Sequence, residues 1–121
     1  MNSLLFVYGT LKRGCSNHRQ LAGQKYVGVA KTQPGFRLYD AGGYPGLAAL
    51  ADDLKGVSGE VWEVEPERLI KLDRFEGVAE GLYRREAVPL RAPFAGQRVE
   101  AYFFAPSVSG RPDVGGEWIE P

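Results

Sequence analysis

The sequence predicts a single mixed α+β domain, built as a curled sheet or small mixed β-barrel with flanking helices. Many short runs of β-branched and aromatic residues are separated by turn residues, and only residues 66–77 carry a strong helical pattern. The runs do not follow the repeated strand-helix-strand order of a doubly wound parallel sheet. The length of 121 residues suits one domain with its own hydrophobic core.

The first half of the chain is predicted to consist mainly of strands. Residues 4–8 are apolar enough for a buried strand, which Gly9 ends. Residues 26–30 and 36–39 are predicted to be two further strands, and the turn signal Pro34-Gly35 lies between them. This is the pattern of a hairpin.

Three segments beside these strands have less regular patterns. Residues 17–22 are predicted to form a short helix with Asn17 as its cap. Residues 40–46 contain three glycines and a proline and are expected to be a loop. The apolar run 47–51 fits a helix because of its alanines, and it fits a strand because it is short.

The clearest helix follows an alternating segment, residues 57–64, which is predicted to be a strand. Pro66 at the first helical position and Gly77 just past the end frame this helix. At 100° per residue its buried stripe is expected to consist of Leu69, Leu72 and Phe75.

The last third of the chain is predicted to add two strands, at residues 83–90 and 99–105, with a polar loop between them. Residues 106–121 are rich in Gly and Pro and are expected to be irregular. The sequence therefore predicts a domain at residues 1–105 and an irregular C-terminal tail at residues 106–121.

Composition narrows the possible partners. Lys plus Arg and Asp plus Glu number 15 each, so the net charge is zero and nucleic acid is not an expected partner. The apolar run Leu4–Val7 is shorter than a signal-peptide core or a membrane span, which favours a cytoplasmic protein with no membrane partner. Cys15 and His18 are the only residues of their types, so no intrachain disulfide and no metal site of nitrogen and sulfur ligands are expected.

Glu76 is the strongest candidate for acid/base chemistry. It follows Leu72 by four residues and Leu69 by seven, so helical geometry places its carboxyl group on the apolar stripe. Burial and the negative end of the helix dipole both favour the neutral acid and raise its pKa. Such a group suits proton transfer between an amine and a leaving group. The alternative is a structural role, in which Glu76 pairs with Arg84 or Arg85 or reaches water.

The turn after the first strand is the second candidate. In Tyr8-Gly9-Thr10-Leu11, successive backbone N–H groups can converge on an anion or a developing oxyanion, and Gly9 permits close approach. An ordinary strand-ending turn explains the same residues. Lys12-Arg13 add positive charge nearby, although a solvated basic pair is the default explanation.

Further residues have weaker signals. Tyr44 and Tyr83 are candidates for lining a pocket, but each also fits ordinary loop or strand packing. Cys15 and His18 are three residues apart, a spacing that invites a thiol nucleophile with an imidazole base. Spacing within a loop does not orient such a pair, so a free cysteine and a loop histidine are the simpler interpretation.

Several motifs together resemble the γ-glutamylcyclotransferase-like superfamily, above all the branch with γ-glutamylamine cyclotransferase and the plant AIG2-like proteins. The resemblance runs from about residue 4 to about residue 105. It is specific in the combination of a Tyr-Gly-Thr-Leu turn and an Asp-x-Phe-Glu helix end. The motifs are Phe6-Val7-Tyr8-Gly9-Thr10-Leu11-Lys12-Arg13-Gly14, Asn17-His18, Tyr44-Pro45, Gly59-Glu60-Val61, Leu72-Asp73-Arg74-Phe75-Glu76-Gly77 and Tyr83-Arg84-Arg85.

The resemblance implies a small mixed barrel with flanking helices and a cofactor-independent reaction. It implies that the substrate's α-amine attacks its own γ-amide carbonyl, which releases 5-oxoproline and an amine or amino acid. Glu76 is then the acid/base, and the turn at Tyr8, Gly9, Thr10 and Leu11 holds the γ-glutamyl moiety. Tyr83 positions Glu76 or the substrate.

Motif similarity alone favours γ-glutamylamines as substrates. Two alternatives stay open: tailoring of a different γ-glutamyl metabolite on the same scaffold, and a non-catalytic module that binds a small acidic ligand. Residues 77–82, where family members differ, are glycine-rich here and add the acidic Glu80. The sequence leaves the oligomeric state open.

Overall fold

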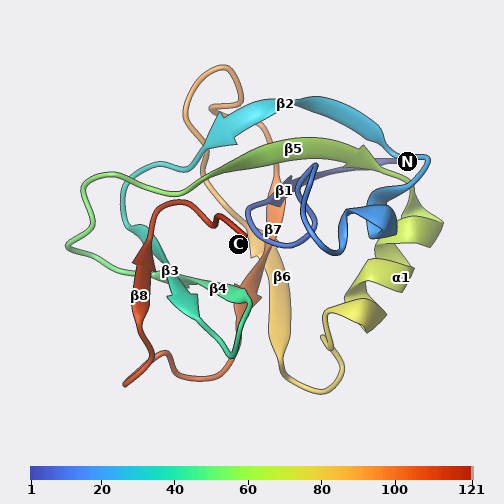
Figure 1. Cartoon of the computed structure of the whole chain (residues 1–121). Helices are drawn as coiled ribbons and strands as arrows, with labels where there is room; N and C mark the ends of the chain where they lie inside the picture. Colours follow the sequence, from blue (N-terminus) through green and yellow to red (C-terminus); the bar gives the residue numbers. More distant parts are fainter. Residues whose placement is uncertain (121) are drawn as a thin grey trace.

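The computed structural model describes residues 1–120, which form one eight-stranded mixed sheet, one α-helix and one 3₁₀ helix (Figure 1). The strands are β1 (Ser3–Val7), β2 (Lys25–Lys31), β3 (Phe36–Asp40), β4 (Pro45–Ala49), β5 (Ser58–Val64), β6 (Tyr83–Ala87), β7 (Glu100–Phe104) and β8 (Asp113–Gly115). The helices are η1 (His18–Leu21), which is 3₁₀, and α1 (Pro66–Phe75). The predicted α+β class is confirmed, and no helix among residues 1–120 has the length and apolar character needed to cross a membrane.

The sheet is strongly curled but open. Its strands lie in the order β2-β5-β1-β7-β4-β3-β8, and β6 pairs with β7 beside this path. Within residues 1–120 the end strands β2 and β8 do not pair with each other, so the word barrel applies only loosely.

The sheet forks at β7. Strand β6 pairs antiparallel with β7 along its whole length, and so occupies one edge of it. Both β1 and β4 pair in parallel with the other edge, through Leu5 opposite Glu100 and Leu47 opposite Phe103. Because one edge of a strand cannot pair with two strands at the same height, the end of β1 and the start of β4 diverge there.

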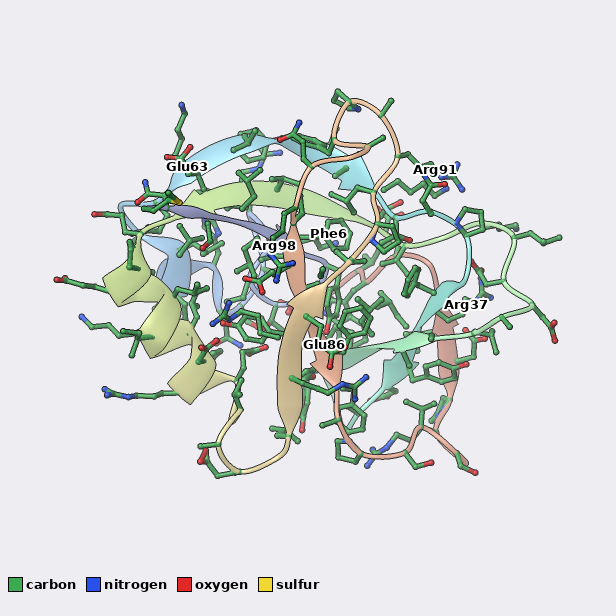
Figure 2. The ribbon with its side chains drawn as sticks, turned by 180° about the vertical axis from the view of Figure 1, so that it is seen from behind. Phe6, Arg37, Glu63, Glu86, Arg91 and Arg98 are labelled. Carbon is green, nitrogen blue, oxygen red and sulfur yellow. The ribbon has the colours of Figure 1, made fainter. Side chains whose placement is uncertain are left out.

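Alternate residues of β1 enter two separate hydrophobic cores. Leu5 and Val7 pack with Leu69 and Leu72 of α1. The intervening residues, including the fully enclosed Phe6, pack in the second core inside the curl of the sheet (Figure 2). This two-sided burial holds the end of β1, where the candidate turn begins, in a fixed position.

The pairing of β2 and β3 and the extent of β4 differ from the prediction. Strands β2 and β3 do not form the expected hairpin, because β2 pairs with β5 and β3 pairs with β4. A local turn signal such as Pro34-Gly35 bends the chain but does not select the partner strand. The first three residues of the ambiguous run 47–51 belong to a strand, β4, which ends at Ala49. This strand begins at Pro45, so the expected loop at residues 40–46 ends two residues earlier than predicted.

Two expectations about helices are also corrected. Phe75 is 41% exposed and is not part of the buried stripe, whereas Leu69 and Leu72 are buried as predicted. The short helix at residues 17–22 is a 3₁₀ helix, and the Asn17 side chain does not cap it. The Asn17 amide donates to Thr10 Oγ1 at 3.0 Å and so joins the helix to the turn after β1.

The C-terminal segment contains more regular structure than expected. Residues 113–115 form β8, which pairs with β3, so the expectation of an irregular tail is wrong for these residues. Trp118 packs against the inner core, and its carbonyl accepts a hydrogen bond of 2.7 Å from Lys12 Nζ. The tail therefore lies against the loop that follows the candidate turn.

Candidate active site

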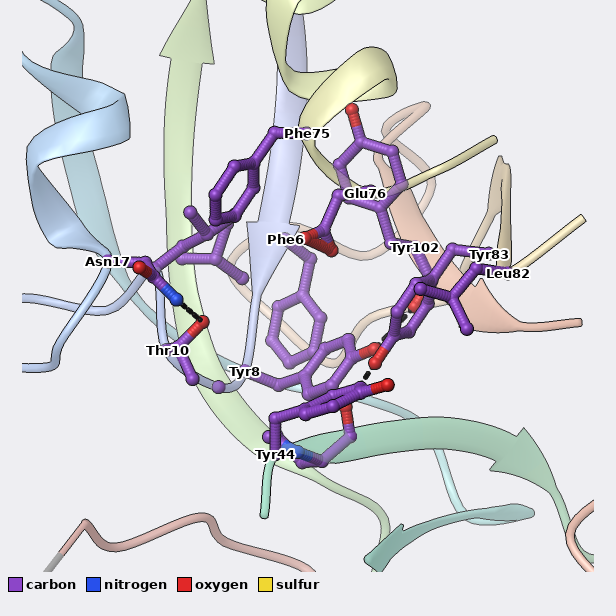
Figure 3. A pocket seen from close by; sticks show the side chains of 14 residues that line it. Phe6, Tyr8, Thr10, Asn17, Tyr44, Phe75, Glu76, Leu82, Tyr83 and Tyr102 are labelled. Carbon is purple, nitrogen blue, oxygen red and sulfur yellow. Dashed lines mark hydrogen bonds between the residues drawn. The ribbon is translucent and has the colours of Figure 1, made fainter. Parts of the chain in front are cut away.

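A cavity of about 290 Å³ lies at the fork between β1 and β4 (Figure 3). All seven site residues named from the sequence line it, namely Tyr8, Gly9, Thr10, Leu11, Tyr44, Glu76 and Tyr83. The remaining lining residues are Phe6, Val7, Asn17, Pro45, Phe75, Leu82 and Tyr102. None of these seven is a site residue predicted from the sequence: Asn17 was expected to cap a helix, and Phe75 to lie in the buried stripe of one. Their strand and helix patterns signal packing, and only the folded arrangement brings them to the cavity.

The end of α1 places Glu76 in this cavity. Glu76 is the C-cap residue, and Gly77 follows it with a φ of +69°, a conformation that glycine adopts without strain. The Val78 N–H donates to Asp73 O at 3.0 Å and the Gly77 N–H donates to Arg74 O at 3.1 Å, which is the Schellman arrangement. This stop fixes the Glu76 backbone, and Figure 3 shows its carboxyl group directed into the cavity.

The Glu76 carboxyl group has no hydrogen-bond donor and no cation paired with it among residues 1–120. The alternative pairing with arginine is not observed, because Arg84 pairs with Glu86 at 2.8 Å and Arg85 pairs with Asp73 and Glu100. Burial raises the pKa of Glu76 to about 7. A carboxyl group in this state can both accept and donate a proton near neutral pH.

Three tyrosines that line the cavity use their hydroxyls in hydrogen bonds within the protein. Tyr83 donates to Pro45 O at 2.7 Å, and Tyr102 donates to Asp73 Oδ1 at 2.7 Å. Tyr8 donates to Tyr102 O at 2.5 Å and accepts from the Leu47 N–H at 3.2 Å. The Tyr8 hydroxyl therefore bridges β4 and β7 at the fork, and burial raises the pKa of this phenol, which keeps it protonated.

Tyr44 differs from these three tyrosines. Its hydroxyl makes no hydrogen bond with the residues that the structure describes, and its ring lies 6.5 Å from the Tyr83 ring, centroid to centroid. The side chain is half-buried at the side of the cavity. Its hydroxyl is thus available to a bound molecule.

The turn after β1 lies across the cavity from Tyr83. The Gly9 carbonyl accepts from the Lys12 N–H at 3.1 Å, and the Thr10 carbonyl accepts from the Asn17 N–H at 2.8 Å. In contrast, the N–H groups of Gly9, Thr10 and Leu11 find no acceptor within residues 1–120. Successive unpaired N–H groups of this kind attract anions and developing negative charge.

Gly9 is required for close packing of this turn. A Cβ atom at this position would lie 2.5 Å from Pro45 Cγ and 3.2 Å from Pro45 Cδ. The proline ring cannot move away freely, because Pro45 begins β4 and its carbonyl accepts the Tyr83 hydroxyl. The turn and the start of β4 therefore touch directly.

A buried glutamate anchors the far end of the same turn. Glu60 of β5 accepts from the Arg13 N–H at 3.1 Å, from Arg13 Nε at 3.0 Å and from Trp62 Nε1 at 3.1 Å. Burial alone would raise the pKa of Glu60, but these donors lower it below its usual value. Glu60 is therefore a structural carboxylate.

Cys15 and His18 do not form a catalytic pair. His18 Nδ1 lies 2.9 Å from the Leu11 carbonyl oxygen, and its ring packs against Trp62 at 5.2 Å between centroids. Burial raises the pKa of the Cys15 thiol, which disfavours the thiolate. No group of three or more His, Cys, Asp or Glu side chains suited to a metal ion occurs within residues 1–120.

The cavity has the features of a small-molecule site: its lining is largely apolar and aromatic, and it contains the Glu76 carboxyl group, which is unpaired within residues 1–120. A sequence model of the family described as gamma-glutamyl cyclotransferase, AIG2-like, matches residues 5–120. The chain belongs to this family, and the match extends past residue 105 through β8.

Relatives in distant organisms support the same membership. A Vibrio cholerae protein that is provisionally named a gamma-glutamylcyclotransferase is 42% identical over 88 residues, which are 73% of each chain. The gamma-glutamylaminecyclotransferase of Rattus norvegicus is 38% identical over 94 residues. That match covers 72% of this chain and 62% of the rat protein, so the chain spans less than two thirds of the rat relative.

Solved structures share the fold. An AIG2-like protein from Mus musculus has a TM-score of 0.78 and 30% identity, with 93% of this chain and 85% of the mouse chain covered. YkqA from Bacillus subtilis also has a TM-score of 0.78, with 31% identity, and the match covers 98% of this chain and 40% of YkqA. The open mixed sheet is thus the fold of these proteins.

Proposed function

We propose that the protein cyclises a γ-glutamyl compound, most favourably a γ-glutamylamine, and releases 5-oxoproline and the amine. The observation that carries the proposal is the Glu76 carboxyl group, which lies in the cavity without a protein partner and has a pKa raised to about 7 by burial. The family membership gives the γ-glutamyl chemistry.

The first step is to hold the substrate folded. Gly9, Thr10 and Leu11 line the cavity, and their unpaired N–H groups offer donors to the oxygens of the γ-glutamyl moiety. Tyr44 offers a further hydroxyl. Because the attacking amine and the γ-carbonyl belong to one molecule, holding the chain folded supplies much of the rate acceleration.

The second step is proton transfer. Ionised Glu76 takes a proton from the attacking α-amine as the new carbon–nitrogen bond closes the five-membered ring. The N–H groups of the turn stabilise the negative charge on the former carbonyl oxygen. Glu76 then gives its proton to the departing nitrogen as the old carbon–nitrogen bond breaks. One proton and one bond are exchanged, so the step balances without a cofactor.

The charges around the cavity support an amine as the leaving group. Glu76 is the one charged residue among the cavity-lining side chains, and Phe75 and Leu82 add apolar surface. A leaving amino acid would bring a carboxylate, for which this lining offers no cation. An amine without a carboxylate avoids that desolvation cost. The rat relative, by its name, acts on γ-glutamylamines.

The test is release of 5-oxoproline from a panel of γ-glutamylamines, γ-glutamyl amino acids and glutathione. Wild-type protein is compared with Glu76→Gln and with Glu67→Gln, which makes the same charge change at an exposed residue in the first turn of α1. We expect release from the amines with wild type and Glu67→Gln, and release slower by at least about 10²-fold with Glu76→Gln.

Other outcomes would redirect the proposal. Release chiefly from γ-glutamyl amino acids would contradict the amine preference. Release at the wild-type rate by folded Glu76→Gln would remove Glu76 from the mechanism. Binding of the panel without release by any variant would favour a non-catalytic module for a small acidic ligand.

A further inference from the structure

Asp73 connects the end of α1 to two strands behind the cavity. Its carboxylate accepts from Arg85 Nε at 2.9 Å and from Arg85 Nη2 at 3.0 Å, which is a forked pair. Its Oδ1 atom also accepts from the Tyr102 hydroxyl at 2.7 Å. The second acceptor of Arg85 is Glu100 on β7, at 2.6 Å from Nη1. Two carboxylates therefore hold one guanidinium.

The Arg85 guanidinium lies close to the cavity wall. Side chains alternate along a strand, so Arg85 is on the same face of β6 as Tyr83, which lines the cavity. In the β6–β7 pairing Arg85 is opposite Tyr102, another lining residue. Asp73 and Glu76 are three residues apart at the helix end, a spacing that brings side chains within about 6 Å of each other. A cation held by Asp73 is thus close to the helix end that carries Glu76.

The groups that face Glu76 from the packed elements are otherwise uncharged. They are the phenols of Tyr8 after β1, Tyr83 on β6 and Tyr102 on β7, and burial raises the pKa of each. Farther out, Arg111 packs over the Phe104 ring at 4.9 Å, and its charge acts on Tyr83. Arg85 differs from Arg111 because its partner, Asp73, lies on the same helix end as Glu76.

Resting on the proposed role of Glu76, we propose that Asp73 is a positioning residue for this glutamate. By holding the Arg85 guanidinium in a forked pair, Asp73 keeps this cation from pairing with Glu76. The Tyr102 hydroxyl fixes the Asp73 carboxylate for this purpose, and Figure 3 shows that hydroxyl pointing away from the cavity. Asp73 and Glu76 therefore compete for the Arg85 guanidinium. Asp73 binds it because its carboxylate is held in the forked arrangement.

The competition matters because a cation beside a carboxyl group favours its ionised form. A close arginine lowers the pKa of a carboxyl group by about 1 to 3. A Glu76 paired with Arg85 would hold no proton near neutral pH and would be a poor donor to the departing nitrogen. By holding Arg85, Asp73 thus preserves the raised pKa that burial gives Glu76.

The test is a ¹³C NMR titration of the glutamate carboxyl groups, with the Glu76 signal assigned by its loss in Glu76→Gln. We expect Asp73→Asn to lower the pKa of Glu76 by about one, which is a tenfold change in proton affinity. Adding Arg85→Gln to Asp73→Asn should return the value to that of wild type. The matched control Glu86→Gln removes a carboxylate whose partner is Arg84 on the exposed side of β6, and should change nothing (Figure 2).

Two results would contradict the proposed role of Asp73. An unchanged Glu76 titration in Asp73→Asn overturns the proposal, and so does a lowered value that persists in the double variant, because the effect then does not pass through Arg85. If Asp73→Asn does not fold, Tyr102→Phe removes the hydroxyl that fixes the Asp73 carboxylate and should lower the value by a smaller amount, and an unchanged value there overturns the proposal. The titration needs no turnover, so failure to release 5-oxoproline counts against the proposed function alone.

Discussion

Two glutamates near the turn after β1 have opposite properties. Glu60, 8% exposed, accepts three hydrogen bonds, and these lower its pKa despite its burial. Glu76 accepts none from residues 1–120, and burial raises its pKa to about 7. Burial therefore decides the protonation of a carboxyl group only where donors are absent. The first glutamate holds the turn in place, and the second faces the molecule that the turn would bind.

The largest expected effect is the loss of turnover when Glu76, and not Glu60, is replaced. Glu76→Gln keeps the size of the side chain but removes the proton-transfer group, so turnover should fall by about 10²- to 10⁴-fold. Glu60→Gln should retain turnover to a larger degree, because Glu76 is intact and only the anchor of the turn is weakened. Steady-state release of 5-oxoproline by the two variants checks this. Equal losses in both would mean that the turn, and not the carboxyl group, limits the reaction.

The second effect appears in stability. The Glu76 pKa is raised above the ordinary 4.5 of a glutamate, so the folded protein favours the protonated form. This contribution is fully present below pH about 4.5 and is lost as the pH rises through about 7. The loss amounts to about 3 kcal/mol in the free energy of unfolding.

Denaturant unfolding at pH 5 and pH 8 measures this loss. Wild type should lose stability between the two values, whereas Glu76→Gln should lose much less and be the more stable protein at pH 8. Glu60→Gln should keep the wild-type loss, since Glu76 is unchanged. The same pH dependence in wild type and Glu76→Gln would show that the carboxyl group does not carry the shift.

The third effect concerns the fork. Tyr8→Phe leaves both the Tyr102 carbonyl and the Leu47 N–H without their partner at the point where β1 and β4 diverge. We expect a loss of about 2 kcal/mol in the free energy of unfolding. Tyr39→Phe is the control, because this tyrosine makes no side-chain hydrogen bond within residues 1–120. A loss in the control as large as that in Tyr8→Phe would refute the bridging role.

The fourth and smallest effect tests the turn itself. Gly9→Ala places a methyl group 2.5 Å from Pro45 Cγ, so the turn must shift away from β4. We expect kcat/KM to fall by about tenfold, since small displacements in a positioned site weaken catalysis. Gly28→Ala is the matched control, because its added methyl group meets only Phe94 Cζ at 3.7 Å. Unaltered kinetics in Gly9→Ala would exclude a close-fitting turn.

The sequence predicts those parts of this site that depend on local patterns. The spacing of Leu69, Leu72 and Glu76 points the carboxyl group inward, and Gly77 marks the helix end. The fork could not be predicted in this way. It depends on β7 pairing with β1 and with β4 across long stretches of sequence, and each of these pairings rests on one residue pair.

The remaining errors have the same origin. Phe75 follows the helical stripe, but it lies at the open cavity and is exposed there. The Asp73–Arg85 pair joins a helix to a strand, and no spacing rule connects the two residues. Strand β8 is only three residues long, which is too short for an alternating pattern to show. The Gly and Pro residues around it therefore predict an irregular segment.

The role of Glu76 is tested by the pH dependence of kcat/KM for release of 5-oxoproline from a γ-glutamylamine, measured from pH 5 to pH 8.5. Activity should rise through pH about 7, where Glu76 ionises, and Glu60→Gln should retain this midpoint. Activity that is already constant above pH about 5.5, as a glutamate with the ordinary pKa of 4.5 would give, or a profile unchanged in Glu76→Gln, would contradict a mechanism that depends on the unpaired Glu76 carboxyl group.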